Sequence, residues 1–316
     1  MSQKNSLRAA CAVLLLAFAS GLGAQTPPPV MPGDLLGSTG AQGGSLVSID
    51  SMTGAGMTRF PLGSLGPVTE IRFRSDGVLF GSTGGGASNF LTIDPDTGTE
   101  ALVGMHAFGA VTAMEFVGST LYGAFFDAGG GGEGGGSTFL VEIDQTDGSL
   151  TNVGQIAGYD PVRGLAYDST TGTMYGVGIP LSAGGEQPEG IFDDLITINL
   201  ATGAPTTVGP TGGFEIGGMT FGPDGLLYGG VARPSAGEGA TVPLVILNTA
   251  TGAATVVGDT GLPALSGLTF VPGGGGGGTV TVAIPTASQL GLLLLGALLA
   301  ASAFLALRRR QPTATR

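Results

Sequence analysis

The chain has 316 residues, of which 62 are glycine and only 11% are charged, and its formal net charge at pH 7 is −12. Six of its 11 basic residues lie in the two terminal segments and all 23 acidic residues lie between them, so the central body carries five basic residues and a formal charge of −18. Such a body repels phosphate backbones and anionic lipid headgroups, which argues against nucleic acid as a partner.

Residues 1–24 have the three parts of a secretory signal peptide. Lys4 and Arg8 give a positive start, residues 9–19 are apolar but too short to span a membrane comfortably, and small residues precede a cleavage site after Ala24. Cys11, the only cysteine, lies at the start of the apolar run, whereas a lipoprotein cysteine follows it. The mature chain then lacks cysteine, which excludes disulfides and thiolate sites.

Between residues 34 and 272 the sequence repeats itself. An Ile or Leu followed by Asp or Asn recurs every 44 to 55 residues, at Ile49-Asp50, Ile93-Asp94, Ile143-Asp144, Ile198-Asn199 and Leu247-Asn248. Each pair leads into a turn and then a short strand that ends in glycine, at Gly63, Gly104, Gly154, Gly209 and Gly258. A further strand in each repeat ends in an aromatic residue, at Phe73, Phe116, Tyr167, Phe221 and Phe270.

The repeat predicts an all-β fold, a five-bladed β-propeller with four strands in each blade. The strands are short and bounded by glycine turns, and four of them in a repeat of this length are typical of one blade. The body begins with three strands, at residues 35–62, and ends with a lone strand at 266–271, which would complete the first blade and close the ring. A distorted six-bladed ring is the alternative. The rhythm of residues 34–272 resembles the PQQ-like and YVTN propeller-repeat proteins, which implies the fold and little about activity.

Length variation is concentrated on one face of this predicted propeller, which we call the inserted face. It carries the loops between the second and third strands of each blade and the loops between blades, and it includes the insertions at 127–138, 180–194 and 233–243. Loops on a rigid scaffold commonly carry binding residues. The candidate binding residues on this face are Asp127, Glu133, Tyr159, Asp160, Glu186, Asp193, Asp194 and Phe214.

Motifs for metal or cofactor chemistry are weak in this sequence. Asp94-Pro95-Asp96-Thr97-Gly98 begins like a calcium loop, but Met105 stands where the twelfth-position glutamate is required. His106 is the only histidine, so a multi-histidine metal site is excluded, and we expect a surface or channel residue. We expect no cofactor, with calcium on the acidic loops as the alternative to a solvated acidic rim. The repeated aromatic residues favour packing between blades over a ligand-stacking ring.

The C-terminal segment has the order of linker, short motif, membrane span and basic stop. A glycine-rich linker at 273–283 precedes Ile284-Pro285-Thr286, and residues 290–307 form an uncharged stretch. Eighteen residues at about 1.5 Å each give roughly 27 Å, close to the thickness of a bilayer core. The arginines that follow are expected to stay in the cytoplasm, which places the body outside it.

This segment resembles the IPTL-CTERM sorting signal, a relative of the PEP-CTERM signals that exosortases process. The matching residues are Ile284, Pro285, Thr286, Ser288, Gly291, Arg308, Arg309 and Arg310, within residues 284–310. Ala287 departs from the family's leucine, and Gln289 and Leu290 stand in place of its usual acidic residue and tryptophan. The resemblance implies processing by signal peptidase and an exosortase-type enzyme, and a final location at the cell surface or in the medium. A plain single-pass anchor in the inner membrane is the alternative.

Two classes of function follow. The first is a non-catalytic surface or secreted propeller that contacts extracellular polysaccharide or protein in adhesion or in a matrix. The second is a propeller enzyme of lyase or lactonase type, which needs a metal or a carboxylate pair at the channel mouth. The equivalent positions of the innermost strands are Arg72, Glu115, Ala166, Thr220 and Thr269. They gather no set of His, Asp and Glu, which favours the non-enzymatic reading.

Overall fold

The computed structural model describes residues 26–40, 44–84, 87–127, 136–182, 192–234 and 239–273. These residues form strands and turns, and none of them belongs to a helix that could cross a bilayer. The predicted signal peptide, the sorting signal with its span and nearly all of the linker lie outside the described residues.

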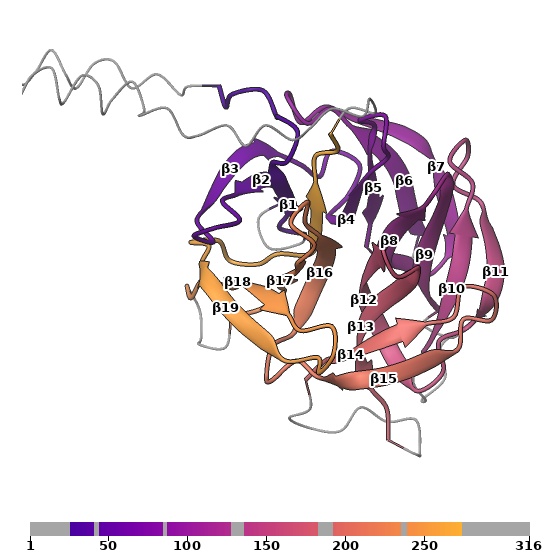
Figure 1. Cartoon of the computed structure of the whole chain (residues 1–316). Coiled ribbons are helices and arrows are strands. Elements are labelled where there is room, and N and C mark those ends of the chain that lie inside the picture. Colours follow the sequence, from indigo (N-terminus) through magenta and orange to yellow (C-terminus); the bar gives the residue numbers. More distant parts are fainter. Residues whose placement is uncertain are drawn as a thin grey trace, which may run out of the picture. The chain divides into compact units, whose positions relative to one another are not determined.

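The described strands form five four-stranded sheets, which we number as blades in chain order (Figure 1). Blade 1 consists of β20 (Gly267–Phe270), β1 (Leu35–Ser38), β2 (Ser45–Ile49) and β3 (Gly56–Pro61). Blade 2 consists of β4 (Val68–Phe73), β5 (Leu79–Thr83), β6 (Ala87–Ile93) and β7 (Glu100–Phe108). Blade 3 consists of β8 (Ala110–Val117), β9 (Thr120–Asp127), β10 (Ser137–Ile143) and β11 (Leu150–Gln155). Blade 4 consists of β12 (Tyr159–Asp168), β13 (Thr173–Pro180), β14 (Asp194–Ile198) and β15 (Pro205–Pro210), and blade 5 of β16 (Ile216–Phe221), β17 (Leu227–Val231), β18 (Pro243–Leu247) and β19 (Ala254–Asp259).

The ring closes within blade 1, as the sequence predicts. The last strand, β20, pairs antiparallel with the first, β1, in a register that sets Leu35 opposite Phe270 and Ser38 opposite Gly267. The inner strands contact one another in the cyclic order β4, β8, β12, β16, β20 and back to β4. Figure 1 shows them around one axis, with β3, β7, β11, β15 and β19 at the rim. The predictions of five blades and of a three-plus-one closure are therefore confirmed.

The repeated Asp or Asn shapes the turn between the third and fourth strands of each blade. Oδ1 of Asp94 accepts the backbone N–H of Asp96 at 2.9 Å, and the N–H of Gly98 donates to the backbone carbonyl of Asp94 at 2.8 Å. Gly98 has a φ of 72°, a conformation that glycine adopts at low cost. A side chain that bonds its own backbone in this way forms an Asx turn. The motif that begins like a calcium loop thus has a structural role.

A second repeated glycine allows each blade to approach the next. A Cβ on Gly154 of β11 would lie 2.0 Å from the carbonyl oxygen of Thr202 in the turn of blade 4, and one on Gly258 would lie 1.9 Å from that of Thr53. Only glycine fits such contacts. Blade 1 departs from the predicted alignment. In β3 the position that the repeated glycine occupies in the other blades is taken by Phe60, which pairs with Leu46, and not by Gly63. Phe60 instead packs against Gly98 of the next turn.

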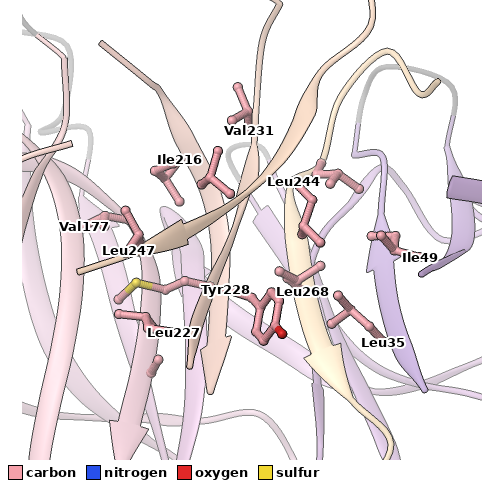
Figure 2. Close-up of a cluster of buried hydrophobic side chains, with 14 of the residues drawn as sticks. Leu35, Ile49, Val177, Ile216, Leu227, Tyr228, Val231, Leu244, Leu247 and Leu268 are labelled. Carbon is pink, nitrogen blue, oxygen red and sulfur yellow. The ribbon is translucent and has the colours of Figure 1, made fainter. Parts of the chain in front are cut away.

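Apolar side chains fill the space between neighbouring blades. Figure 2 shows the cluster in which Tyr228 and Leu244 of blade 5 meet Leu35 and Ile49 of blade 1. The aromatic residues at the ends of the inner strands pack on aromatic residues of the preceding blade, in the pairs Phe80–Phe116, Tyr175–Phe221 and Tyr228–Phe270, with ring centroids 6.1, 5.8 and 5.4 Å apart. Their predicted role in packing between blades is confirmed.

Candidate binding site at the channel mouth

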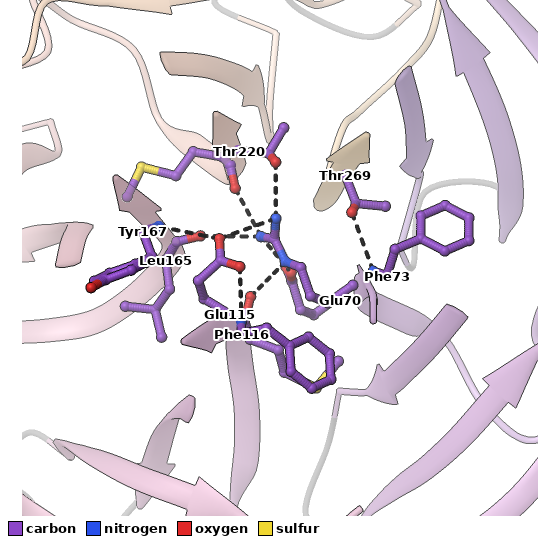
Figure 3. Close-up of polar contacts among 11 residues, drawn as sticks. Glu70, Phe73, Glu115, Phe116, Leu165, Tyr167, Thr220 and Thr269 are labelled. Carbon is purple, nitrogen blue, oxygen red and sulfur yellow. Dashed lines mark hydrogen bonds and ion pairs between the residues drawn. The ribbon is translucent and has the colours of Figure 1, made fainter. Parts of the chain in front are cut away.

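The central channel is filled by the side chain of Arg72, which extends from β4 and is 3% exposed. Its Nε donates to the carbonyl of Met114 at 2.8 Å, and its Nη2 donates to the carbonyls of Leu165 and Met219 at 3.1 and 2.9 Å. Its Nη1 donates to the hydroxyl of Thr220 at 3.0 Å. Figure 3 shows Leu165 and Thr220, together with Glu70 and Glu115, converging from different inner strands. One guanidinium group therefore links blades 2, 3, 4 and 5.

Two carboxylates accompany Arg72. Glu70 lies 3.5 Å from Nη2 and Glu115 lies 3.4 Å from Nη1. Burial raises the pKa of Glu70 well above its usual range, against the opposing effect of Arg72. Burial also raises the pKa of Glu115, whose oxygens accept the N–H groups of Phe116 and Tyr167. These carboxylates stabilise the inner strands around Arg72.

A pocket of about 280 Å³ lies on the axis at the inserted face. It is lined by Thr69, Gly84, Ala110, Thr112, Pro161, Arg163, Glu215, Gly217, Ala232, Arg233 and Ser266, which lie at or near the beginnings of inner strands or the ends of second strands. Arg72 lies three residues further along β4 than Thr69, or about 10 Å at roughly 3.3 Å per residue. The guanidinium network therefore lies below the pocket, which we call the mouth pocket.

An ion-pair cluster lies on one side of the mouth pocket. Oε1 of Glu215 is 3.0 Å from Nη1 of Arg163 and 3.3 Å from Nε of Arg233. The side chain of Arg163 is 18% exposed and that of Arg233 is 72% exposed. The pairs of Arg163 with described residues use only Nη1, and those of Arg233 use only Nε. Both guanidinium groups thus retain donors beyond these pairs.

Asp193 anchors this cluster from below the surface. Its carboxylate is 3.5 Å from Nη1 of Arg163 and accepts the backbone N–H of Ile216 at 2.6 Å. The hydroxyl of Thr211 donates to the backbone carbonyl of Asp193 at 2.9 Å. Burial raises the pKa of Asp193 to about 6, although Arg163 acts in the opposite direction. Asp193 therefore fixes the position of Arg163 and the start of β16.

None of the predicted candidate residues that the structure describes lines the mouth pocket. Glu133 and Glu186 lie outside the described residues. Asp127 is the exposed last residue of β9, Asp194 is the half-buried first residue of β14, and Phe214 packs against the core between blades. The pocket does lie on the inserted face. The described candidate residues, however, do not come together in one site.

The expectation of a solvated acidic rim is wrong for Asp193, which is fully buried. Asp160, which was predicted only as a candidate binding residue in a loop, is also buried and is 3% exposed. Tyr159 and Asp160 belong to β12 and not to a loop, and the Tyr159 hydroxyl bonds that of Thr207. These side chains turn inward because Thr138 donates to Asp160, just as Ile216 donates to Asp193.

His106 also differs from its prediction as a surface or channel residue. It lies in β7, far from the axis, and is 4% exposed. Its Nδ1 is 2.8 Å from the carbonyl oxygen of Gly148 in the next blade, and its ring packs 5.3 Å from that of Phe90. Burial lowers the pKa of His106, which favours a neutral ring. Its role is packing between blades 2 and 3.

Sequence reasoning did not single out Arg163, Glu215 and Arg233 as a site. Each occurs in only one repeat, so the repeat pattern gives no signal for them. The sequence did carry one indication of the site. Basic residues are rare in the body, which has only five, all of them arginine. Three of the five, Arg72, Arg163 and Arg233, lie in the channel or at its mouth.

No group of three or more His, Cys, Asp and Glu side chains among the described residues is arranged to hold a metal ion. No protein-family model matches the chain, and no curated protein matches it.

Three solved structures are similar to this chain at low sequence identity. A 6-phosphogluconolactonase candidate from Bacteroides fragilis is 13% identical, with 78% of this chain and 100% of that chain covered and a TM-score of 0.42. The periplasmic gluconolactonase PpgL of Pseudomonas aeruginosa is 13% identical, with 75% and 98% covered and a TM-score of 0.41. A protein of unknown function from Bacteroides caccae is 11% identical, with 76% and 99% covered and a TM-score of 0.43. Similarity at this level does not carry over an activity.

Proposed function

We propose that this chain is an exported propeller, sorted through its C-terminus, which acts as a non-catalytic binding module at the cell surface or in the medium. Its ligand site is the mouth pocket on the inserted face. The partners are extracellular polysaccharide or protein, and signal peptidase and an exosortase-type enzyme process the chain.

The observation that carries the proposal is the pairing of charges at the mouth pocket. The body is strongly acidic, yet two of its five arginines line this one pocket. They hold Glu215 between them at 3.0 and 3.3 Å. Arg163 is held by Glu215 and by the buried Asp193, and a charged group fixed in this way is suited to recognition because little rearrangement is needed when a ligand arrives.

The same geometry is poor for acid–base catalysis. A general acid and a general base need two groups that can exchange protons with the substrate. Among the described residues that line the pocket, Glu215 is the one carboxylate, and two guanidinium groups hold it. Glu70 and Glu115 are paired with Arg72 below the pocket, and Asp193 is fully buried behind Arg163 and does not line the pocket.

Export rests on the sequence of the two termini. Residues 1–24 have the organisation of a signal peptide, and residues 284–310 resemble a sorting signal. An extracellular location suits a body without cysteine and with a formal charge of −18, which keeps it soluble.

The test is to incubate the full-length protein, purified in detergent, with extracellular polysaccharide of the native host. Binding is measured by co-sedimentation, and the recovered saccharide is analysed by mass spectrometry. A binding module returns the saccharide unchanged. Unsaturated chain ends would favour the lyase alternative, and ring opening of an added sugar lactone would favour the lactonase alternative. Either result would overturn the non-catalytic assignment.

A further inference from the structure

The donors left free at the mouth pocket define the charge of its ligand. Nη2 of Arg163, together with Nη1 and Nη2 of Arg233, makes no pair with described residues. The planar end of a guanidinium group presents parallel N–H donors that match the two oxygens of a carboxylate. Arg233, with 72% of its side chain exposed, is the more accessible of the two arginines.

The charge balance favours a ligand group with a single negative charge. Among the groups that line the pocket, two guanidinium groups face the single carboxylate of Glu215, and the buried carboxylate of Asp193 behind Arg163 offsets further positive charge. A phosphate monoester carries more negative charge than a carboxylate at neutral pH, so Glu215 and Asp193 repel it more strongly. A carboxylate therefore suits the site better than a phosphate.

The charge of the whole body limits what the carboxylate can be attached to. At −18 the body repels a long polyanion, and this repulsion acts over about 8 Å at physiological ionic strength. A chain with a carboxylate on every sugar therefore approaches poorly. A largely neutral molecule that presents one carboxylate meets little of this repulsion.

The rest of the pocket fits a sugar. Its volume of about 280 Å³ is small for a small-molecule site, and its lining includes the hydroxyl-bearing residues Thr69, Thr112 and Ser266. Phe192, which is 50% exposed, immediately precedes Asp193 and lies about 4 Å from the Cβ position of Gly213. This exposed ring does not line the pocket, but it is next in sequence to the Asp193 that pairs with Arg163, and it offers apolar area for the C–H face of a sugar ring.

We infer that the mouth pocket binds a single uronic acid residue, either as a free sugar acid or at the end of an otherwise neutral saccharide. Arg233 and Arg163 bind its carboxylate, and the lining hydroxyl groups face the sugar. This inference rests on the proposed function and specifies its ligand.

The test is isothermal titration of the full-length protein in detergent with four probes. They are a disaccharide of glucuronic acid and glucose, the neutral disaccharide cellobiose, free glucuronate and glucose 6-phosphate. We expect the uronic acid disaccharide to bind at least tenfold more tightly than cellobiose and glucose 6-phosphate. Free glucuronate distinguishes the two sources of the carboxylate, because comparable affinity points to a free sugar acid and much weaker affinity to a saccharide end.

The variant Arg233→Gln should bind the disaccharide about tenfold more weakly, because it removes two charge-assisted hydrogen bonds. Arg74→Gln is the matched control, since Arg74 is a partly exposed arginine that is also paired with a carboxylate, Asp76, but it follows β4 at its far end. Its affinity should stay within twofold of the unaltered protein. Circular dichroism confirms that both variants are folded.

The outcomes separate this inference from the proposed function. Equal binding of cellobiose, tighter binding of glucose 6-phosphate, or unchanged affinity in Arg233→Gln would overturn the uronic acid site and leave a binding module with another ligand. Absence of binding to all four probes, with host polysaccharide still bound, would do the same. Chemical conversion of a probe would instead overturn the non-catalytic function.

Discussion

Nη1 of Arg72 donates to the hydroxyl of Thr220 at 3.0 Å, and this bond joins the inner strands of blades 2 and 5, which are not neighbours in the ring. The same guanidinium group reaches the inner strands of blades 3 and 4. A single side chain therefore ties four blades together below the mouth pocket.

Replacing Arg72 should destabilise the propeller strongly. Arg72→Met leaves Glu70 and Glu115 without their cation, and breaking a buried ion pair typically costs about 3–5 kcal/mol. Arg74→Met provides the control, because the solvent-accessible pair of partly exposed Arg74 with exposed Asp76 should contribute no more than about 1 kcal/mol. Urea unfolding of the two variants measures both values. Equal losses would contradict the role of Arg72.

Asp193 should make stability depend on pH in the acid range. Its folded pKa of about 6 exceeds its ordinary value of 3.8, so between these values the folded state binds more protons than the unfolded state. The free energy of unfolding contributed by this group therefore falls as pH rises from about 4 to 6, and it levels off above that. A shift of about two pKa units corresponds to an effect on the order of 2–3 kcal/mol.

The variant Asp193→Asn isolates this effect, because its amide oxygen can still accept the N–H of Ile216. The difference in unfolding free energy between unaltered protein and variant, measured by urea unfolding at several pH values, should decrease from pH 4 to 6. A difference that increases over this range would show that the carboxylate has a lowered pKa.

The contact between blades 3 and 4 should not tolerate a methyl group. In Gly154→Ala the new Cβ would lie 2.0 Å from the carbonyl oxygen of Thr202, so the blades must separate, at a cost of about 1–3 kcal/mol. Gly158→Ala is the comparison, since Gly158 has a φ of 84° but no atom within 4 Å of its Cβ position. Its strain alone should cost roughly 1 kcal/mol. Thermal unfolding ranks the two, and the reverse order would refute the proposed contact.

The sorting motif is tested in the native host. Changing Ile284, Pro285 and Thr286 to alanine should leave full-length protein in the inner membrane if these residues direct processing. Mass spectrometry of C-terminal peptides in inner-membrane, outer-membrane and medium fractions gives the answer. Arg309→Ala, in a cluster that keeps two other arginines, serves as a milder comparison. Unchanged processing of the triple variant would mean that the motif is not the determinant.

The sequence predicted the blades because each blade uses the same local chemistry. The turn made by Asp94 and Gly98 recurs at Asp50 and Gly54, and local hydrogen bonds define both turns. The first three strands and the last strand could be assigned to one blade because the order of strands within the repeat continues to β20 at the end of the body. Nothing comparable identified the ion cluster at the mouth pocket.

The candidate site was predicted only to the level of a face. Arg163 and Glu215 lie 52 residues apart and meet because their strands adjoin the axis. Asp193 was expected in solvent, but its burial depends on a bond to Ile216 in another blade. Contacts between single residues of different repeats leave no periodic signal, so they required the structure.

The most direct test of the central claim is hydrogen exchange of the full-length protein with and without polysaccharide from the native host, followed by mass spectrometry. A ligand in the mouth pocket should protect backbone amides near Thr112, Arg163 and Gly217, at the starts of inner strands. Peptides of the turns on the opposite face, such as Asp94 to Gly98, should be unchanged. Protection confined to the outer strands or to the opposite face would contradict a binding site at the channel mouth.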